Sequence, residues 1–168
     1  NVTVAAPNHL WVGTGAASEA RVLRSSDGGR TWAVARTPLD AGPSAGIFSI
    51  AFSDARHGLV VGGDYKAETV AGNNAAITTD GGATWTAQTP PVRGRSFSDV
   101  VVRGDRGWIV GESGTLLSSA DGGASWQTTP VPIELAANWL RGVALTPAGR
   151  GLAVGADGLV FRLDGERF

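Results

Sequence analysis

The sequence contains no cysteine and no methionine, and it has a single lysine and a single tyrosine among 168 residues. The absence of cysteine excludes a disulfide framework, a Cys-ligated zinc or iron–sulfur site and a thiol nucleophile. No segment approaches the roughly 20 consecutive apolar residues of a membrane helix, so we expect no direct membrane insertion. The 14 basic and 15 acidic side chains nearly cancel. Without a strong positive charge the chain has no general attraction for nucleic acid, and we expect no nucleic-acid partner.

An eight-residue motif recurs along the chain with the pattern Ser/Thr-x-Asp-Gly-Gly-x-Thr/Ser-Trp. It occupies 25–32, 78–85 and 119–126, and a fourth copy at 163–166 keeps only Asp-Gly. The four aspartates are 53, 41 and 43 residues apart. A second motif, Leu/Trp-x-Val-Gly, recurs in phase with the first and ends at Gly13, Gly62, Gly111 and Gly155. Two motifs in phase at this period predict a fold built from repeated units.

Each repeat predicts four short strands. The first is an apolar stretch such as 47–52, the second carries the Val-Gly motif, the third precedes Asp-Gly-Gly, and the fourth begins at the Thr/Ser-Trp after it. Asp-Gly-Gly between apolar runs predicts a tight hairpin, because glycine supplies the positive φ that such turns need. Four antiparallel strands about every 45 residues are typical of a β-propeller. We therefore predict an all-β partial propeller with about four blades, at 1–38, 47–90, 96–130 and 139–168.

The strand count also predicts an incomplete ring. The chain ends after the third strand of the last repeat, so we expect the last blade to lack its outer strand. Asn1 begins directly on an innermost strand. We expect these residues to be the C-terminal part of a seven-bladed ring, with the remaining blades supplied by an upstream chain. An open arc exposes two blade faces that a closed ring buries.

The motifs carry a family resemblance. The Asp-Gly-Gly motif resembles the bacterial neuraminidase repeat, or Asp-box. The coupled pattern Asp-x-x-x-Gly-x-x-Val-Gly at 54–62 resembles the branch that includes the photosystem II stability/assembly factor, and the resemblance covers essentially the whole chain. It implies an assembly or stability factor, or an accessory subunit, of a membrane complex that is photosynthetic in a phototrophic host. The implied location is extracytoplasmic, in a periplasm or a thylakoid lumen.

We assign the Asp-box residues a structural role. The carboxylate accepts N–H bonds across its own turn, the glycines supply unusual dihedrals, and the tryptophan fills space between strands or neighbouring blades. Equivalent carboxylates recur once per blade, so they cannot converge on one catalytic or calcium site. These residues are Asp27, Gly28, Gly29, Trp32, Asp80, Gly81, Gly82, Trp85, Asp121, Gly122, Gly123 and Trp126.

The face opposite the Asp-box turns is the expected binding face. It is built from loops that lead into each innermost strand and loops that join second to third strands. The 63–74 loop is the longest of these, and long loops on one face commonly carry binding residues. Arginines on a neighbouring inlet loop predict a basic rim that recognises carboxylate or phosphate. The family resemblance likewise implies an arginine-rich patch that contacts a client protein. The predicted partner-binding residues are Tyr65, Lys66, Glu68, Arg93, Arg95, Trp139 and Arg141. Each assignment has an alternative. The 63–74 loop could be a solvated segment without a partner, the arginines could serve only solubility, and Trp139 could be a core residue.

The catalytic alternatives lack the residues they need. A sialidase requires a Tyr nucleophile, and Tyr65 is the only tyrosine. A glycosidase requires two carboxylates at a fixed separation, and no spacing selects a pair among Asp40, Asp64, Asp99, Glu112 and Glu134. Both histidines, His9 and His57, are expected on the opposite face, so we predict no metal site.

We therefore predict a non-catalytic protein-interaction module without a cofactor, whose partner is a membrane complex or one of its subunits. The alternative is a secreted sialidase-like or other glycoside hydrolase, or a carbohydrate-binding propeller.

Overall fold

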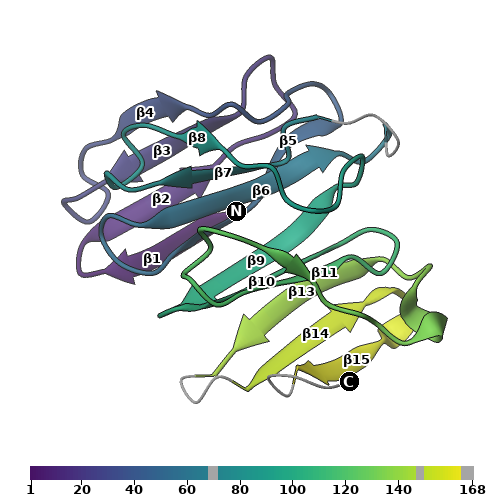
Figure 1. Cartoon of the computed structure of the whole chain (residues 1–168). Helices are drawn as coiled ribbons and strands as arrows, with labels where there is room; N and C mark the ends of the chain where they lie inside the picture. The colour runs from purple at the N-terminus through teal and green to yellow at the C-terminus, as the bar shows by residue number, and fades with distance from the viewer. Residues whose placement is uncertain (68–71, 147–149, 164–168) are drawn as a thin grey trace.

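The computed structural model describes residues 1–67, 72–146 and 150–163, and antiparallel sheets dominate it (Figure 1). Three sheets have four strands, and the fourth has three within the described residues. We refer to the sheets as blades 1 to 4 in chain order. Blade 1 contains β1 (Val2–Ala6), β2 (His9–Gly13), β3 (Arg21–Ser25) and β4 (Ala33–Arg36). Blade 2 contains β5 (Ala45–Phe52), β6 (Gly58–Asp64), β7 (Ala75–Thr78) and β8 (Thr86–Ala87).

The second half of the chain repeats this arrangement. Blade 3 contains β9 (Phe97–Arg103), β10 (Arg106–Gly111), β11 (Leu116–Ser119) and β12 (Gln127–Thr128). Blade 4 contains β13 (Leu140–Leu145), β14 (Gly151–Gly155) and β15 (Val160–Leu163). Two short 3-10 turns complete the described elements, η1 (Ile133–Leu135) and η2 (Ala156–Gly158). No helix in the described ranges has the length and apolar character of a membrane span.

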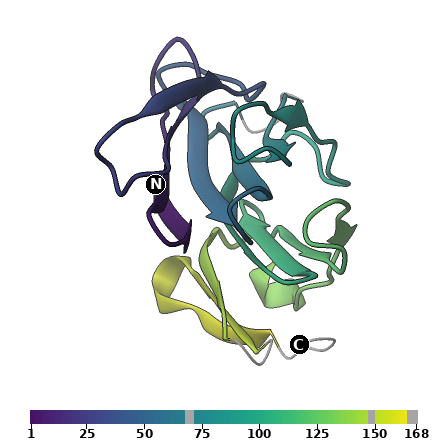
Figure 2. The same cartoon turned by 90° about the vertical axis from the view of Figure 1, so that its left-hand side faces the viewer.

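The blades follow one another around an open arc (Figure 2). The innermost strands β1, β5, β9 and β13 pack against their neighbours in that order. Blade 1 and blade 4 form the two ends of the arc, and apolar side chains are exposed on both. At the first end these include Val2, Val4 and Val34, and at the other Leu152, Val154 and Val160. The predicted all-β partial propeller of about four blades is confirmed.

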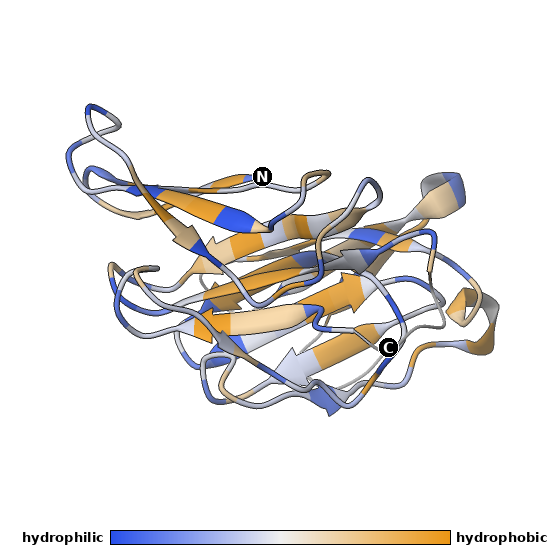
Figure 3. Ribbon diagram, turned by 90° about the horizontal axis from the view of Figure 1, so that it is seen from above, coloured by the Kyte–Doolittle hydropathy of each residue, from blue (hydrophilic) through white to orange (hydrophobic). Residues whose placement is uncertain are grey.

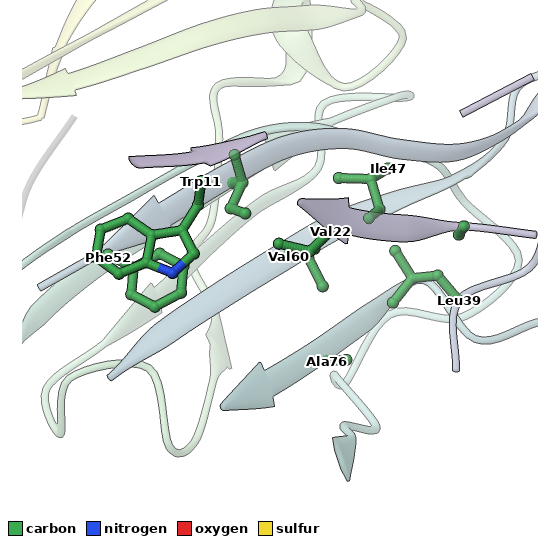
Figure 4. Close-up of a cluster of buried hydrophobic side chains, with 9 residues drawn as sticks. Trp11, Val22, Leu39, Ile47, Phe52, Val60 and Ala76 are labelled. Carbon is green, nitrogen blue, oxygen red and sulfur yellow. The ribbon is translucent and has the colours of Figure 1, made fainter. Parts of the chain in front are cut away.

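The core lies between the blades. At the first seam Trp11 of β2 stacks on Phe52 of β5, with ring centroids 3.8 Å apart and an interplanar angle of 10° (Figure 4). Val22 and Val60 pack in the same cluster. Comparable clusters fill the other two seams. Hydrophobic stretches follow the strands in Figure 3, while much of the connecting backbone is hydrophilic. The blades thus bury their apolar faces against one another, which fixes the order of the arc.

Each Asp-box forms the same hydrogen-bonded turn. In the first, Asp27 Oδ1 accepts the backbone N–H groups of Arg30 and Thr31, both at 2.9 Å, and Oδ2 accepts the Thr31 hydroxyl at 2.6 Å. The Thr31 hydroxyl is the strongest of the influences that hold the pKa of Asp27 at about 2. Gly28 and Gly29 have φ of 75° and 88°, which a side chain would strain. Asp80 and Asp121 anchor equivalent turns. The fourth strands begin just after the box tryptophan, later than the sequence predicts, because the box fixes the preceding residues.

The Asp-box tryptophans differ in burial. Trp126 is 9% exposed and packs with Leu59 of the preceding blade. Trp85 is half-buried and meets Phe52 edge to face, with centroids 6.0 Å apart. Trp32 is 42% exposed. Trp32 bonds within its own turn, where its indole N–H donates to the carbonyl of Gly29 at 3.0 Å, because blade 1 forms the end of the arc and has no preceding blade within the described residues.

The second motif is also out of register in its first copy. Ser25 and Thr78 begin the first two Asp-boxes, and Leu10 and Gly58 are the residues that pair with them. When β2 and β6 are aligned on these pairs, Gly13 corresponds to Val61, whereas the motif predicts that it corresponds to Gly62. Gly13 has a different role, because a Cβ there would overlap the side chain of Ile47 on blade 2. The position that the second motif predicts for its glycine in blade 1 is therefore wrong by one residue.

Candidate functional site

A hollow of about 430 Å³ lies on the side of the arc where the innermost strands begin. We call this side the entry face and the hollow the entry hollow. It is opposite the Asp-box turns, which contact the hairpins at the other end of these strands, as in the bond from the Gly28 N–H to the Asn8 carbonyl. The entry hollow is lined by Phe48, Tyr65, Ser98, Trp139 and Arg141. Three of these residues, Tyr65, Trp139 and Arg141, were predicted as partner-binding, and they come from blade 2 and blade 4.

Three of the lining residues occupy the same structural position. Phe48, Ser98 and Arg141 are the unpaired residues of β-bulges near the starts of β5, β9 and β13. A bulge inserts one extra residue into a strand and redirects its side chain. Each of these blades therefore directs one side chain from its innermost strand into the entry hollow.

The glycine of the second motif lies opposite each of these bulges. Gly62 pairs beside the bulge of β5 and Gly111 beside that of β9. A Cβ on Gly62 would overlap the carbonyl oxygen of Gly46, and one on Gly111 would overlap that of Ser96. The glycine of the motif thus leaves room for the bulge, and the bulged residue contributes its side chain to the entry hollow.

Contacts inside the entry hollow hold its walls in place. The Trp139 indole N–H donates a hydrogen bond of 2.6 Å to Ser98 Oγ, which connects blade 4 to blade 3. The Arg141 guanidinium lies 3.7 Å from the centroid of the Trp139 ring, a cation–π geometry. Phe48 and Tyr65 form a tilted ring pair with centroids 6.4 Å apart. Lys66 Nζ lies 5.9 Å from the Tyr65 ring centroid, so a second cation flanks the aromatic wall.

Asp99 joins three blades beneath the entry hollow. Its Oδ1 accepts the hydroxyl of Ser49 on β5 at 2.6 Å and the N–H of Val100 at 2.9 Å. Its Oδ2 accepts the N–H of Val143 on β13 at 2.9 Å. These donors satisfy both oxygens, so Asp99 is placed as a structural residue and not as a free catalytic carboxylate.

The predicted basic rim is divided between two places. Arg141 lines the entry hollow, whereas Arg95 lines a separate hollow of about 260 Å³ together with Asp40 and Asp64. A hydrogen bond from the Ser44 side chain is the largest of the effects that lower the pKa of Asp64. Arg93 is exposed on the connecting loop. Glu68 lies outside the described residues.

Glu112 and His57 have partners within the protein. Glu112 is buried and its Oε2 accepts the N–H of Ser96 at 3.0 Å. His57 Nδ1 lies 2.8 Å from Asp54 Oδ2 on the face of the Asp-boxes. Across the described ranges, no group of three His, Cys, Asp or Glu side chains is arranged to hold a metal ion.

The family model for "Photosynthesis system II assembly factor YCF48" matches residues 37–162. The chain belongs to this family. The match covers blades 2 and 3 completely and most of blade 4, and so includes all three bulges of the entry hollow.

Curated relatives agree with this assignment. The photosystem II assembly lipoprotein Ycf48 of Synechococcus sp. (strain CC9902) is 31% identical over 93 residues, which are 52% of this chain and 25% of that protein. The photosystem II stability/assembly factor HCF136 of Oryza sativa subsp. japonica is 30% identical over 114 residues, which are 64% of this chain and 25% of that protein. The chain thus spans about a quarter of the length of these relatives.

Solved structures are similar over most of the chain. YCF48 bound to a D1 peptide is 30% identical, with a TM-score of 0.60 over 71% of this chain and 38% of that one. The GH74 enzyme of Niastella koreensis has a TM-score of 0.69 over 93% of this chain and 27% of that one, at 17% identity. The second likeness shows the fold alone.

Sequence reasoning missed Phe48 and Ser98 as site residues. Both lie in apolar or mixed strand segments where a regular alternation would direct them elsewhere. The available signal was the in-phase glycine of the second motif, which marks where a bulge fits opposite it.

Proposed function

We infer that this protein is a non-catalytic interaction module of the YCF48 family that binds a protein client of a membrane complex through its entry face. The observation that carries the proposal is the convergence of four predicted residues, Tyr65, Lys66, Trp139 and Arg141, at or beside one hollow. They come from distant parts of a chain whose family is named for photosystem II assembly. The structure of YCF48 with a D1 peptide supports a polypeptide as the kind of ligand.

The surrounding surface supports a protein client. Exposed aromatic area next to arginine is the composition of strong protein contact sites. Tyr65 is 43% exposed, and Arg141 presents its guanidinium from an exposed position beside Trp139. Arg93 and Arg95 extend positive charge along the neighbouring inlet loop. The client contacts the entry face, and the Asp-box face is left to hold the blades together.

The relatives support an extracytoplasmic location. One is named a lipoprotein and another is chloroplastic. We place the protein peripherally on the periplasmic or lumenal side of a membrane, where it assists assembly or stability of a photosynthetic complex in a phototrophic host. Further blades of the same kind cover the apolar faces at the two ends of the arc, in a ring of seven.

Carbohydrate hydrolysis is the weaker alternative. The GH74 likeness has 17% identity and carries only the fold. A glycosidase needs two carboxylates facing one sugar cleft, and none of the described residues that line the entry hollow is acidic.

Affinity purification from host membranes tests the proposal. The full-length tagged protein is expressed in its host, isolated from detergent-solubilised membranes and analysed by quantitative mass spectrometry. We expect subunits of one membrane complex to be enriched with the wild type and reduced about tenfold or more in the Trp139→Ala/Arg141→Glu double variant, since central aromatic and arginine residues dominate such interfaces.

The Arg30→Glu variant provides the matched control, because Arg30 is an exposed arginine on the opposite, Asp-box face. It should retain the enrichment of the wild type. Equal enrichment in the entry-face and Asp-box-face variants, or no membrane-complex subunit with the wild type, would contradict the proposal.

A further inference from the structure

Two of the polar side chains that line the entry hollow, Ser98 and Trp139, bond to each other. The Trp139 N–H is bonded to Ser98, and the aromatic rings of Phe48 and Tyr65 pack against each other. The Arg141 guanidinium stacks on Trp139 and has no ion pair within the described part of the chain. The hollow therefore offers a ligand an aromatic surface and one cationic donor group at its edge.

This composition selects the chemistry of the occupant. Three aromatic rings favour a bulky apolar group, because its burial releases water from both surfaces. A guanidinium that is stacked on one face still presents its N–H edge, which matches a carboxylate in a bidentate geometry. Among the described residues, no carboxylate lines the hollow to compete for that edge. Two acidic residues are next to lining residues in the sequence. Asp99 has both oxygens occupied by donors of the protein, and Asp64 lines the separate hollow with Arg95.

A neutral sugar fits these walls less well. Carbohydrate sites combine an aromatic platform with several hydrogen-bonding side chains that read the hydroxyl groups. Here the lining side chains with polar atoms are Ser98, Trp139, Tyr65 and Arg141, and the first two are bonded to each other. The positive charge of the Arg141 guanidinium favours an acidic group of a ligand over a hydroxyl group.

We propose that the entry hollow binds an extended polypeptide segment in which a bulky apolar side chain enters the aromatic walls and a carboxylate beside it pairs with Arg141. This proposal rests on the proposed function, since it names the chemistry of the client segment. Lys66, beside Tyr65, adds a second positive charge at the rim for a further acidic residue.

The test uses the indole N–H signals of the isotope-labelled protein in nitrogen–proton correlation spectra. The chain has six tryptophans, and the Trp139 signal is assigned by its loss in Trp139→Phe. The probes are three acetylated and amidated pentapeptides, Gly-Ser-Asp-Phe-Gly, Gly-Ser-Asn-Phe-Gly and Gly-Ser-Asp-Ala-Gly, and a neutral xyloglucan oligosaccharide. We expect Gly-Ser-Asp-Phe-Gly to shift the Trp139 signal saturably, with the Trp85 and Trp126 signals unchanged.

The matched peptides and variants isolate each part of the proposal. Replacing Asp by Asn, or Phe by Ala, should weaken binding about tenfold, the size of effect expected from one charge-assisted hydrogen bond or one buried aromatic ring. Arg141→Gln should remove the preference for Asp over Asn, whereas Arg30→Gln should preserve it. Equal affinity of the Asp and Asn peptides, a Trp139 response to the oligosaccharide alone, or no response to any probe would overturn the proposal.

The two proposals fail in different ways. If wild-type protein captures a membrane complex through the entry face while the peptides leave Trp139 unaffected, the chemistry assigned to the ligand is wrong and the assembly function stands. If the Asp-Phe peptide binds as expected and no complex is captured, the ligand chemistry stands and the assembly function is wrong.

Discussion

The indole N–H of Trp11 in blade 1 donates a hydrogen bond of 2.9 Å to the carbonyl oxygen of Gly81 in the Asp-box of blade 2. The Trp11 ring also stacks on Phe52 of blade 2 and is almost completely buried. One side chain therefore joins the apolar seam to the turn of the next blade. The Asp-box stabilises its own hairpin and also provides an acceptor for the neighbouring blade.

Replacing Trp11 tests this seam. Trp11→Phe keeps an aromatic ring in the seam but loses the bond to Gly81, and should lower the free energy of unfolding by about 1 kcal/mol. Trp11→Ala should lower it by about 3–5 kcal/mol, because it also leaves a cavity. Chemical denaturation measures both values. In the control Trp32→Phe, where the ring is 42% exposed, the change should be about 0.5 kcal/mol or less. Equal losses at both positions would contradict the seam model.

A stabilising substitution follows from comparing two seams. At the second seam, Gln88 Oε1 accepts the Trp126 indole N–H at 3.3 Å, and Gln88 Nε2 donates to the carbonyl of Gly123 at 2.9 Å. At the first seam the indole N–H of Trp85 is buried and has no hydrogen-bond partner in the described part of the chain, and Ala35 occupies the position of Gln88.

Ala35→Gln should therefore supply the missing acceptor and raise the free energy of unfolding by about 0.5–1.5 kcal/mol. The gain should shrink when the same change is made in Trp85→Phe, which has no indole N–H to satisfy. A double-mutant cycle by chemical denaturation gives the coupling. An equal gain in both backgrounds would show that the acceptor is not the cause.

The Asp-box carboxylates predict loss of stability in acid. Hydrogen bonds, led by those from the Thr31 and Ser125 hydroxyls, hold the pKa values of Asp27 and Asp121 at about 2. An unfolded aspartate titrates near 3.9. Because the folded pKa is the lower one, this contribution is complete above about pH 4 and is lost as the pH falls toward 2. The unfolding temperature should therefore decrease over this interval.

Asp121→Asn provides the corresponding control. Asn keeps one acceptor oxygen and does not titrate, so the variant should be less stable at pH 6 and should lose less stability between pH 4 and 2 than the wild type. Thermal unfolding followed by circular dichroism at several pH values measures both effects. An unchanged acid dependence would show that Asp121 does not contribute to it.

The bulge of β9 can be tested at the glycine opposite it. In Gly111→Ala the new Cβ would overlap the carbonyl oxygen of Ser96, so the strand pair must shift. We expect a loss of about 1–3 kcal/mol in the free energy of unfolding and a displaced Trp139 indole signal, since the bulged Ser98 accepts that N–H. Gly42→Ala, where a Cβ meets only Ala45 at 3.9 Å, should change neither. A normal Trp139 signal in Gly111→Ala would contradict the role assigned to this glycine.

The sequence motifs predict much of the fold, because each Asp-box is a local structure. Its carboxylate, glycines and hydroxyl residues all bond within a few residues of one another, so Asp27 and its equivalents can be identified from the sequence alone. The exposure of Trp32 depends on the end of the arc, which no local pattern contains. The position of Gly13 depends on how β2 pairs with β3, the strand before the Asp-box, and on Ile47 of the next blade. The spacing of the motifs in the sequence shows neither contact.

The entry hollow was only partly predictable for the same reason. Tyr65, Trp139 and Arg141 are noticeable by residue type and by their positions in or near loops. Phe48 and Ser98 reach the hollow through bulges, which interrupt the alternation used to assign the face of a strand. Arg95 and Arg141 are similar in type and predicted face, yet they line different hollows because they belong to different blade seams.

Site-specific photo-crosslinking in the host tests the central claim most directly. A benzoylphenylalanine replaces Tyr65 in the entry hollow of the full-length protein or, in a second strain, Arg30 on the Asp-box face. After irradiation, the crosslinked products are identified by mass spectrometry. The account predicts a crosslink from position 65 to a subunit of a membrane complex and none to that subunit from position 30. A crosslink to such a subunit from position 30 with none from position 65 would contradict it.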